Sequence, residues 1–119
     1  MDINVKGLPE LTQLLRDFAN ARDWAQFHTP RNLATALSVE AAELLEPFQW
    51  MPGDSPNELS PDVLQSVTNE MADVFAYLLL LADKLNVDLS VALQAKVVAN
   101  NEKYPVELVR GSSKKYSEY

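Results

Sequence analysis

The chain has 119 residues, of which 47% are hydrophobic and 23% charged, so it is long enough for one domain with its own core. Its net charge of −7 argues against nucleic acid as a partner, because proteins that bind the phosphate backbone carry clustered lysine and arginine. The absence of cysteine excludes disulfides, a thiolate zinc site and a cysteine nucleophile.

Hydrophobic periodicity and helix-capping residues predict four helices and no strand, so the expected fold class is all-α. The first helix is expected over residues 9–24, where leucines recur on one stripe. The second begins at Thr29-Pro30, because threonine caps a helix and proline suits its first position. This helix is expected to end at about residue 46, just before Pro47.

A loop rich in proline, residues 47–59, separates the second helix from the third. Ser60-Pro61 repeats the capping signal and opens a third helix of roughly 25 residues, about 37 Å long. The third helix is expected to end at about residue 85, just before Asn86. The fourth helix is expected to start at Asp88 or Leu89 and to end at about Lys103.

The predicted domain covers residues 1–108, and residues 109–119 are expected to form a flexible tail. Residues 1–7 include Asp2 and contain no apolar segment, so they do not resemble a signal peptide. The longest apolar run, residues 74–82, is far shorter than the roughly 20 residues of a membrane span. We therefore expect a soluble cytoplasmic protein without a membrane partner.

The expected third helix is apolar on nearly all sides between Val74 and Ala82. A helix on the outside of a four-helix bundle exposes one polar side, so this pattern predicts a second partner surface. A homodimer or tetramer built through this helix is the economical explanation. The alternative is that the chain buries this helix centrally by itself.

Two pairs of carboxylates on consecutive helices predict a site for a divalent cation. Glu40/Glu43 and Glu70/Asp73 both have the spacing i, i+3, which places each pair on one helical face among apolar neighbours. Burying these side chains is costly unless a cation compensates them, and carboxylate oxygens suit Mg²⁺, Mn²⁺ or Ca²⁺. Antiparallel packing of the two helices would let the pairs face one another. Alternatively, these residues are surface acids paired with lysine or arginine.

A di-iron bundle is excluded as a reading of these acids, because it requires Glu-x-x-His motifs and the single histidine, His28, lies outside both pairs. On the fourth helix Lys96, Asn100 and Lys103 share one face, which suits a polyphosphate carried with Mg²⁺. An ordinary solvated face is the alternative. Tyr77, on the face of the acids, is placed either to donate to a ligand or to pack in the core.

Aromatic residues and the histidine flank the second helix at both of its ends, which lie about 25 Å apart. One chain does not easily bring these residues together, but two chains do. Rings that flank a pocket can stack on a nucleobase, although aromatics at helix ends often serve only to cap a core. The residues concerned are Trp24, Phe27, His28, Phe48 and Trp50.

Taken together, these motifs resemble the MazG-like all-α nucleoside triphosphate pyrophosphohydrolases, and within them most of all the dCTP pyrophosphatase branch. The resemblance covers residues 11–105, nearly the whole predicted domain. It rests on RDWAQFHTPRNL at residues 22–33, EAAEL at 40–44, FQW at 48–50, EMADV at 70–74, Tyr77, and Lys96 with Asn100.

The resemblance implies a four-helix bundle-like fold assembled as a homotetramer, with sites formed between subunits. It implies Mg²⁺, with Mn²⁺ as a second possibility, held by Glu40, Glu43, Glu70 and Asp73. It further implies that Lys96 and Asn100 contact the phosphates. The residues that it places around the base and sugar are Trp24, His28, Trp50 and Tyr77.

The resemblance implies a reaction that cleaves a nucleoside triphosphate between its α- and β-phosphates in nucleotide clean-up, with dCTP or a modified dCTP as the expected substrate. No side chain is placed for a covalent intermediate, so direct attack by water is expected, with Glu40 or Glu43 activating it. The alternatives are a dUTP or phosphoribosyl-ATP pyrophosphohydrolase and a non-catalytic bundle that binds metal or nucleotide.

Overall fold

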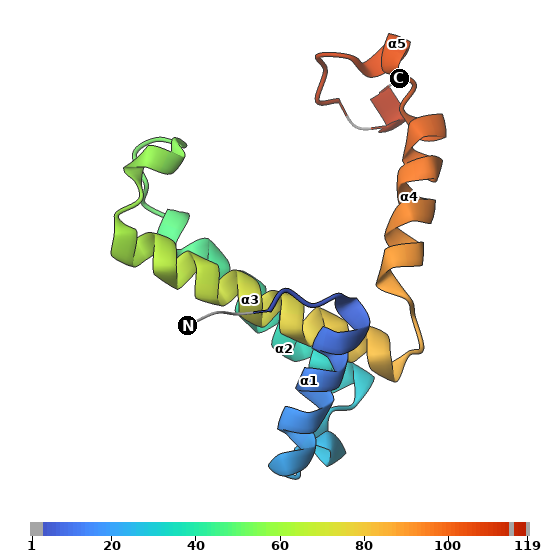
Figure 1. Cartoon of the computed structure of the whole chain (residues 1–119). Helices are drawn as coiled ribbons and strands as arrows, with labels where there is room; N and C mark the ends of the chain where they lie inside the picture. The colour runs from blue at the N-terminus through green and yellow to red at the C-terminus, as the bar shows by residue number, and fades with distance from the viewer. Residues whose placement is uncertain (1–3, 115, 119) are drawn as a thin grey trace. The chain divides into compact units, whose positions relative to one another are not determined.

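The computed structural model describes residues 4–114 and 116–118, and this part of the chain is all-α, as predicted. Residues 115 and 119 of the predicted tail lie outside it. Among the described residues, no helix is long and apolar enough to cross a membrane. The helices are α1 (Leu8–Ala21), α2 (Pro30–Leu45), α3 (Pro61–Lys84), α4 (Leu89–Lys103) and the short α5 (Val106–Val109) (Figure 1). Single 3₁₀ turns are η1 (Ala25–Phe27), η2 (Glu46–Phe48), η3 (Pro56–Glu58) and η4 (Tyr116–Glu118).

The starts of α2, α3 and α4 are confirmed, and each is fixed by a side chain that accepts a hydrogen bond from the backbone two or three residues into the helix. The Thr29 hydroxyl accepts from the Asn32 amide at 3.2 Å, and the Ser60 hydroxyl accepts from the Val63 amide at 3.3 Å. The Asp88 carboxylate accepts from the Val91 amide at 3.1 Å. Each such cap stabilises its helix by about 1 kcal/mol.

The predicted end of the first helix at residue 24 is wrong, because α1 stops at Ala21. Asp23 adopts a left-handed backbone with φ of 55°, which no helix can continue, and the separate turn η1 follows. Asn86, with φ of 55°, ends α3 in the same way, as predicted. Asparagine and aspartate tolerate this conformation better than most other residues.

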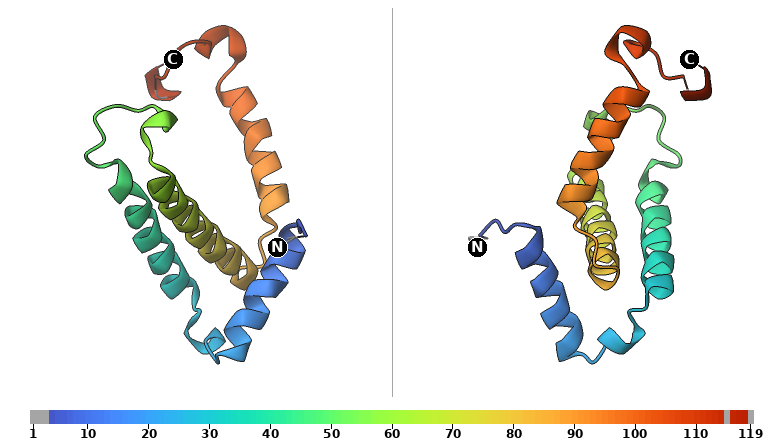
Figure 2. Two further views of the ribbon diagram at one scale, coloured as in Figure 1. Left: turned by 60° about the vertical axis from the view of Figure 1, so that its left-hand side comes forward. Right: turned by 90° about the vertical axis from the view of Figure 1, so that its right-hand side faces the viewer.

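The described chain divides into two compact units, one through residue 86 and one from residue 87 onward, and each is described by itself. In the first unit α3 packs against both α1 and α2. Figure 2 shows α2 and α3 side by side and antiparallel, which is the packing that lets acids on the two helices face one another. The core of this unit consists of Ala19, Leu33, Val67, Leu79, Leu80 and Ala82.

One face of α3 remains apolar and exposed after this packing. Its side chains recur at intervals of seven, four and three residues, which places them on one stripe. Each of these side chains is between 36% and 56% exposed. A continuous exposed apolar surface of this kind is typical of a face that binds a partner. The stripe consists of Leu64, Met71, Phe75 and Leu78.

A bidentate ion pair joins α1 to α3. Arg16 Nε donates to Asp83 Oδ2 at 2.9 Å, and Arg16 Nη2 donates to Asp83 Oδ1. The hydrogen bond from Arg16 lowers the pKa of Asp83, against a smaller opposing effect of burial. These residues lie 67 positions apart, so their pairing fixes the angle of α1 on α3 rather than a local turn.

Replacing Arg16 by alanine should lower the free energy of unfolding only slightly, because the pair is partly exposed to solvent, which screens it. The pair stabilises the fold above the ordinary pKa of aspartate and ceases to do so as pH falls through the lowered pKa of Asp83. Urea unfolding near neutral pH measures the loss, with Arg31→Ala on the exposed side of α2 as the control. Equal stability of Arg16→Ala and wild type would show that the pair contributes nothing.

Candidate metal and nucleotide site

Three of the four predicted carboxylates meet between α2 and α3. Glu40 and Glu43 come from one face of α2, and Glu70 comes from α3. One oxygen of each lies within 4.8 Å of the others, and all three side chains are half-buried. The antiparallel packing of the two helices therefore gathers three acids that are up to 30 residues apart in the sequence.

The arrangement leaves negative charge without compensation. Glu40 Oε2 and Glu70 Oε2 are both buried and have no hydrogen-bond partner. The neighbouring Glu70, then burial, then Glu43 raise the pKa of Glu40 from 4.5 to about 7. A buried acid in this situation binds either a proton or a cation.

The geometry fits a small divalent cation. Mg²⁺ binds oxygen at about 2.0–2.1 Å in an octahedron, so its ligand oxygens lie no more than about 4.2 Å apart. The three oxygens are already close to this spacing, and the unpartnered oxygens of Glu40 and Glu70 are available as ligands. The donor set, carboxylates only, favours Mg²⁺ or Mn²⁺ over the softer transition metals.

Asp73, the fourth predicted ligand, is not part of this group of oxygens. It lies one turn after Glu70 on α3, and its side chain is exposed. An aspartate carboxylate is one methylene closer to its backbone than a glutamate carboxylate, so it reaches less far across the helix pair. Its role as a metal ligand stays a prediction.

Trp24 lies at the turn after α1 and packs against that helix. Its ring meets the ring of Phe18 edge-to-face, with centroids 5.8 Å apart. The guanidinium of Arg22 covers the Phe18 ring at 3.7 Å and donates to the Phe18 carbonyl at 3.0 Å. Trp24 is still 46% exposed, so packing within this chain accounts for only part of its surface.

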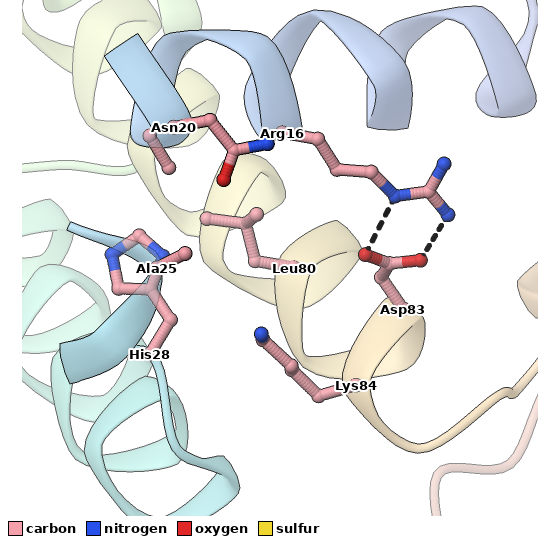
Figure 3. Close-up of a pocket in the computed structure, with 8 residues that line it drawn as sticks. Arg16, Asn20, Ala25, His28, Leu80, Asp83 and Lys84 are labelled. Atoms are coloured by element: carbon pink, nitrogen blue, oxygen red, sulfur yellow. Dashed lines mark hydrogen bonds and ion pairs between the residues drawn. The ribbon is translucent and has the colours of Figure 1, made fainter. Parts of the chain in front are cut away.

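His28 is held between η1 and α2 and lines an open pocket of about 190 Å³ (Figure 3). The Asn32 side chain donates to the Phe27 carbonyl at 2.9 Å, which ties η1 to the first turn of α2. Leu80 lies at the centre of the view, with the Arg16–Asp83 pair beside it. The pocket is lined by Arg16, Ala19, Asn20, Ala25, His28, Leu80, Asp83 and Lys84.

Tyr77 connects the acid cluster with this pocket along one face of α3. It lies seven residues after Glu70 and three before Leu80, spacings that keep all three on the same side of a helix. Glu70 and Leu80 are about 15 Å apart along the axis. The Tyr77 side chain is half-buried, and it does not line the pocket itself.

The other predicted residues lie elsewhere. Trp50 follows η2 and is 86% exposed. It lies beyond the end of α2 opposite to His28, and the unbroken α2 separates the two ends by about 24 Å. Lys96, which is exposed, and Asn100, which is half-buried, lie one turn apart on α4 in the second unit.

The ion pair and most of the pocket were not found from the sequence. Arg16 and Asp83 carry no local motif and come together only through the packing of α1 on α3. Lys84 and Asn20 likewise enter the pocket from surface positions of their helices. Opposite charges far apart in a sequence give no signal of pairing, so only the tertiary structure identifies them.

The chain is all-α and gathers carboxylates between two antiparallel helices, an arrangement that can bind a divalent cation. Residues 35–119 match the MazG-like family. The chain is 42% identical over 113 residues to dCTP pyrophosphatase 1 of Bos taurus and to that of Homo sapiens. These matches cover 93% of this chain, which spans about two thirds of the length of each relative.

A solved structure is similar as well. The crystal structure of a pyrophosphatase from Archaeoglobus fulgidus has 39% sequence identity and a TM-score of 0.72. The match covers 88% of this chain and 98% of that one. The chain belongs to the MazG-like family, and the expected enzyme class, a nucleoside triphosphate pyrophosphatase, is confirmed.

The stability of the metal-free protein should fall as pH rises from about 4.5 to about 7, because the folded state raises the pKa of Glu40 to about 7. In that interval the folded protein binds more protons than the unfolded chain, so each rise in pH favours unfolding. Melting curves in EDTA at about pH 5 and about pH 8 measure the effect. Glu40→Gln should flatten the dependence, and an equal slope in the variant and wild type would contradict this origin.

Millimolar Mg²⁺ or Mn²⁺ should raise the melting temperature at neutral pH, since a cation that binds only the folded state stabilises it. The rise should disappear in Glu70→Gln, which replaces one charged ligand by an amide of the same shape. Glu46→Gln, on the exposed turn after α2, serves as the control and should keep the rise. A melting temperature of wild type that is indifferent to both ions would contradict the metal site.

Proposed function

We propose that this MazG-like pyrophosphatase hydrolyses dCTP or a modified dCTP to the monophosphate and pyrophosphate with Mg²⁺, and so clears surplus or non-standard nucleotides in the cytoplasm. The observation that carries the proposal is the cluster of Glu40, Glu43 and Glu70, with its two buried, unpartnered oxygens. The similarity to the dCTP pyrophosphatases supports the choice of substrate.

Glu40, Glu43 and Glu70 are proposed to hold the metal, with Asp73 as a further ligand one turn along α3. Bound Mg²⁺ would supply a Lewis acid that polarises the α-phosphate and offsets its developing charge. Glu40 or Glu43 accepts a hydrogen bond from the attacking water, orients it in line with the scissile bond and takes its proton. The leaving group is then pyrophosphate, and no covalent intermediate forms.

The remaining predicted residues are proposed to bind the substrate. Lys96 and Asn100 donate to the outer phosphates from adjacent turns of α4. The base lies toward the Tyr77 end of the α3 face, where His28 lines the pocket. Trp24 and Trp50, both substantially exposed in this chain, offer rings for stacking.

A homotetramer with sites between subunits is proposed as the active assembly. The apolar stripe on α3 supports association, because four exposed apolar side chains on one stripe favour burial against a second copy. Association would also compensate for the distance between His28 and Trp50, which lie at opposite ends of α2. A second chain can bring its own aromatic residues to the site.

With Mg²⁺ and a panel of dCTP, 5-methyl-dCTP, dUTP and phosphoribosyl-ATP, the purified protein should release monophosphate and pyrophosphate, and fastest from a cytosine nucleotide. Product analysis by anion exchange separates pyrophosphate from phosphate. Glu40→Ala should abolish turnover while circular dichroism and sedimentation remain as in wild type, and Glu46→Ala should stay active. Diphosphate and phosphate as products would contradict cleavage at the α-phosphate, and full activity of Glu40→Ala would contradict the site.

A further inference from the structure

The C-terminal segment turns back on the end of α4. After α5 the chain brings Tyr116 of η4 to Tyr104, the residue that follows α4. The ring of Tyr116 meets the ring of Tyr104 edge-to-face, with centroids 6.0 Å apart and planes at 84°. This contact lies wholly within the second unit of the chain.

The two rings enclose one ammonium group. Lys103 Nζ lies 4.6 Å from the centroid of the Tyr116 ring and 5.7 Å from that of Tyr104. Both distances are within the range of about 6 Å at which a cation is attracted to a ring face. The nearer ring is the one supplied by the C-terminal segment, so Tyr116 makes the stronger of the two contacts.

These contacts restrict a side chain that is otherwise free to move. An exposed lysine loses rotamer entropy when its side chain is fixed. Two cation–π contacts on one ammonium offset part of that loss. The two contacts therefore favour one placement of the Lys103 ammonium, against the rings of Tyr104 and Tyr116.

Lys103 lies at the end of the polar face of α4 that is proposed to bind phosphate. Lys96, Asn100 and Lys103 are four and three residues apart on the continuous helix α4, so they occupy one face. Lys103 lies about 4.5 Å further along the axis than Asn100. It extends the proposed phosphate-binding face by one turn and adds a third donor to it.

We propose that Tyr116 is a positioning residue, which together with Tyr104 holds Lys103 at the end of this face so that its ammonium contacts the outermost phosphate of the triphosphate. The inference rests on the proposed function and deepens it. A lysine that is already ordered binds phosphate at a smaller entropic cost, so the C-terminal segment increases affinity for triphosphate over monophosphate.

The test compares four full-length proteins, wild type, Tyr116→Leu, Tyr116→Phe and Lys103→Ala, by calorimetry with Mg²⁺ and a dCTP analogue carrying an α,β-imido bridge. Tyr116→Leu should weaken binding of the analogue about five-fold, the equivalent of about 1 kcal/mol, and leave binding of dCMP unchanged. Tyr116→Phe should restore affinity, because it keeps the ring face. Unchanged or tighter binding by Tyr116→Leu would overturn the inference.

A second measurement follows Lys103 directly. After reductive ¹³C-methylation of the lysines, the ring currents of the two tyrosines should shift the Lys103 resonance away from the exposed lysines, and Tyr116→Leu should move it back. A resonance that does not respond to Tyr116→Leu would overturn the inference even if affinity falls. Wild type that shows the shifted resonance but binds no analogue would contradict the proposed function instead, so the two failures are distinguishable.

Discussion

The repulsion between carboxylates at the junction of α2 and α3 is the constraint on which the rest of the structure depends. Glu40, Glu43 and Glu70 would be far more stable apart in water, and two of their oxygens are buried without a partner. The raised pKa of Glu40, about 7, records the strain that this proximity imposes. Only a framework with independent stability can hold such a group together, and a divalent cation bound there would offset the repulsion.

That framework is the apolar packing of α3. Val67, Leu79 and Leu80 face the neighbouring helices, and each buried aliphatic side chain contributes about 1.5–3 kcal/mol relative to exposure. The Arg16–Asp83 pair contributes little to the free energy of folding, because it is partly exposed to solvent. Its main effect is on the orientation of α1 relative to α3. The acid face of α3 and its exposed apolar stripe lie on different sides of the same helix, so the surface available for a second copy does not compete with the proposed metal site.

In the second unit, the polar residues of interest lie on one helix rather than on two. On α4 a single helical face presents Lys96, Asn100 and Lys103, and the geometry follows from the helix itself. Its basic end is restrained by the rings of Tyr104 and Tyr116, which the helix alone would not supply. The polar face of α4 thus has a regular backbone, but the placement of its last side chain, Lys103, depends on the C-terminal segment that supplies Tyr116.

The sequence by itself determined the features that depend on neighbours within one turn. Capping by Thr29, Ser60 and Asp88 placed three helix starts, and the i, i+3 acids identified the faces of α2 and α3 that meet. A helix end set by one residue's backbone was missed at Asp23, because aspartate is common inside helices as well as at their ends. Only the tertiary structure decided which oxygens converge, why Asp73 stays outside them, and that Arg16 meets Asp83 and Lys103 meets Tyr116. Local structure is fixed by hydrogen bonds along the chain, whereas these contacts depend on angles between helices that no local pattern encodes.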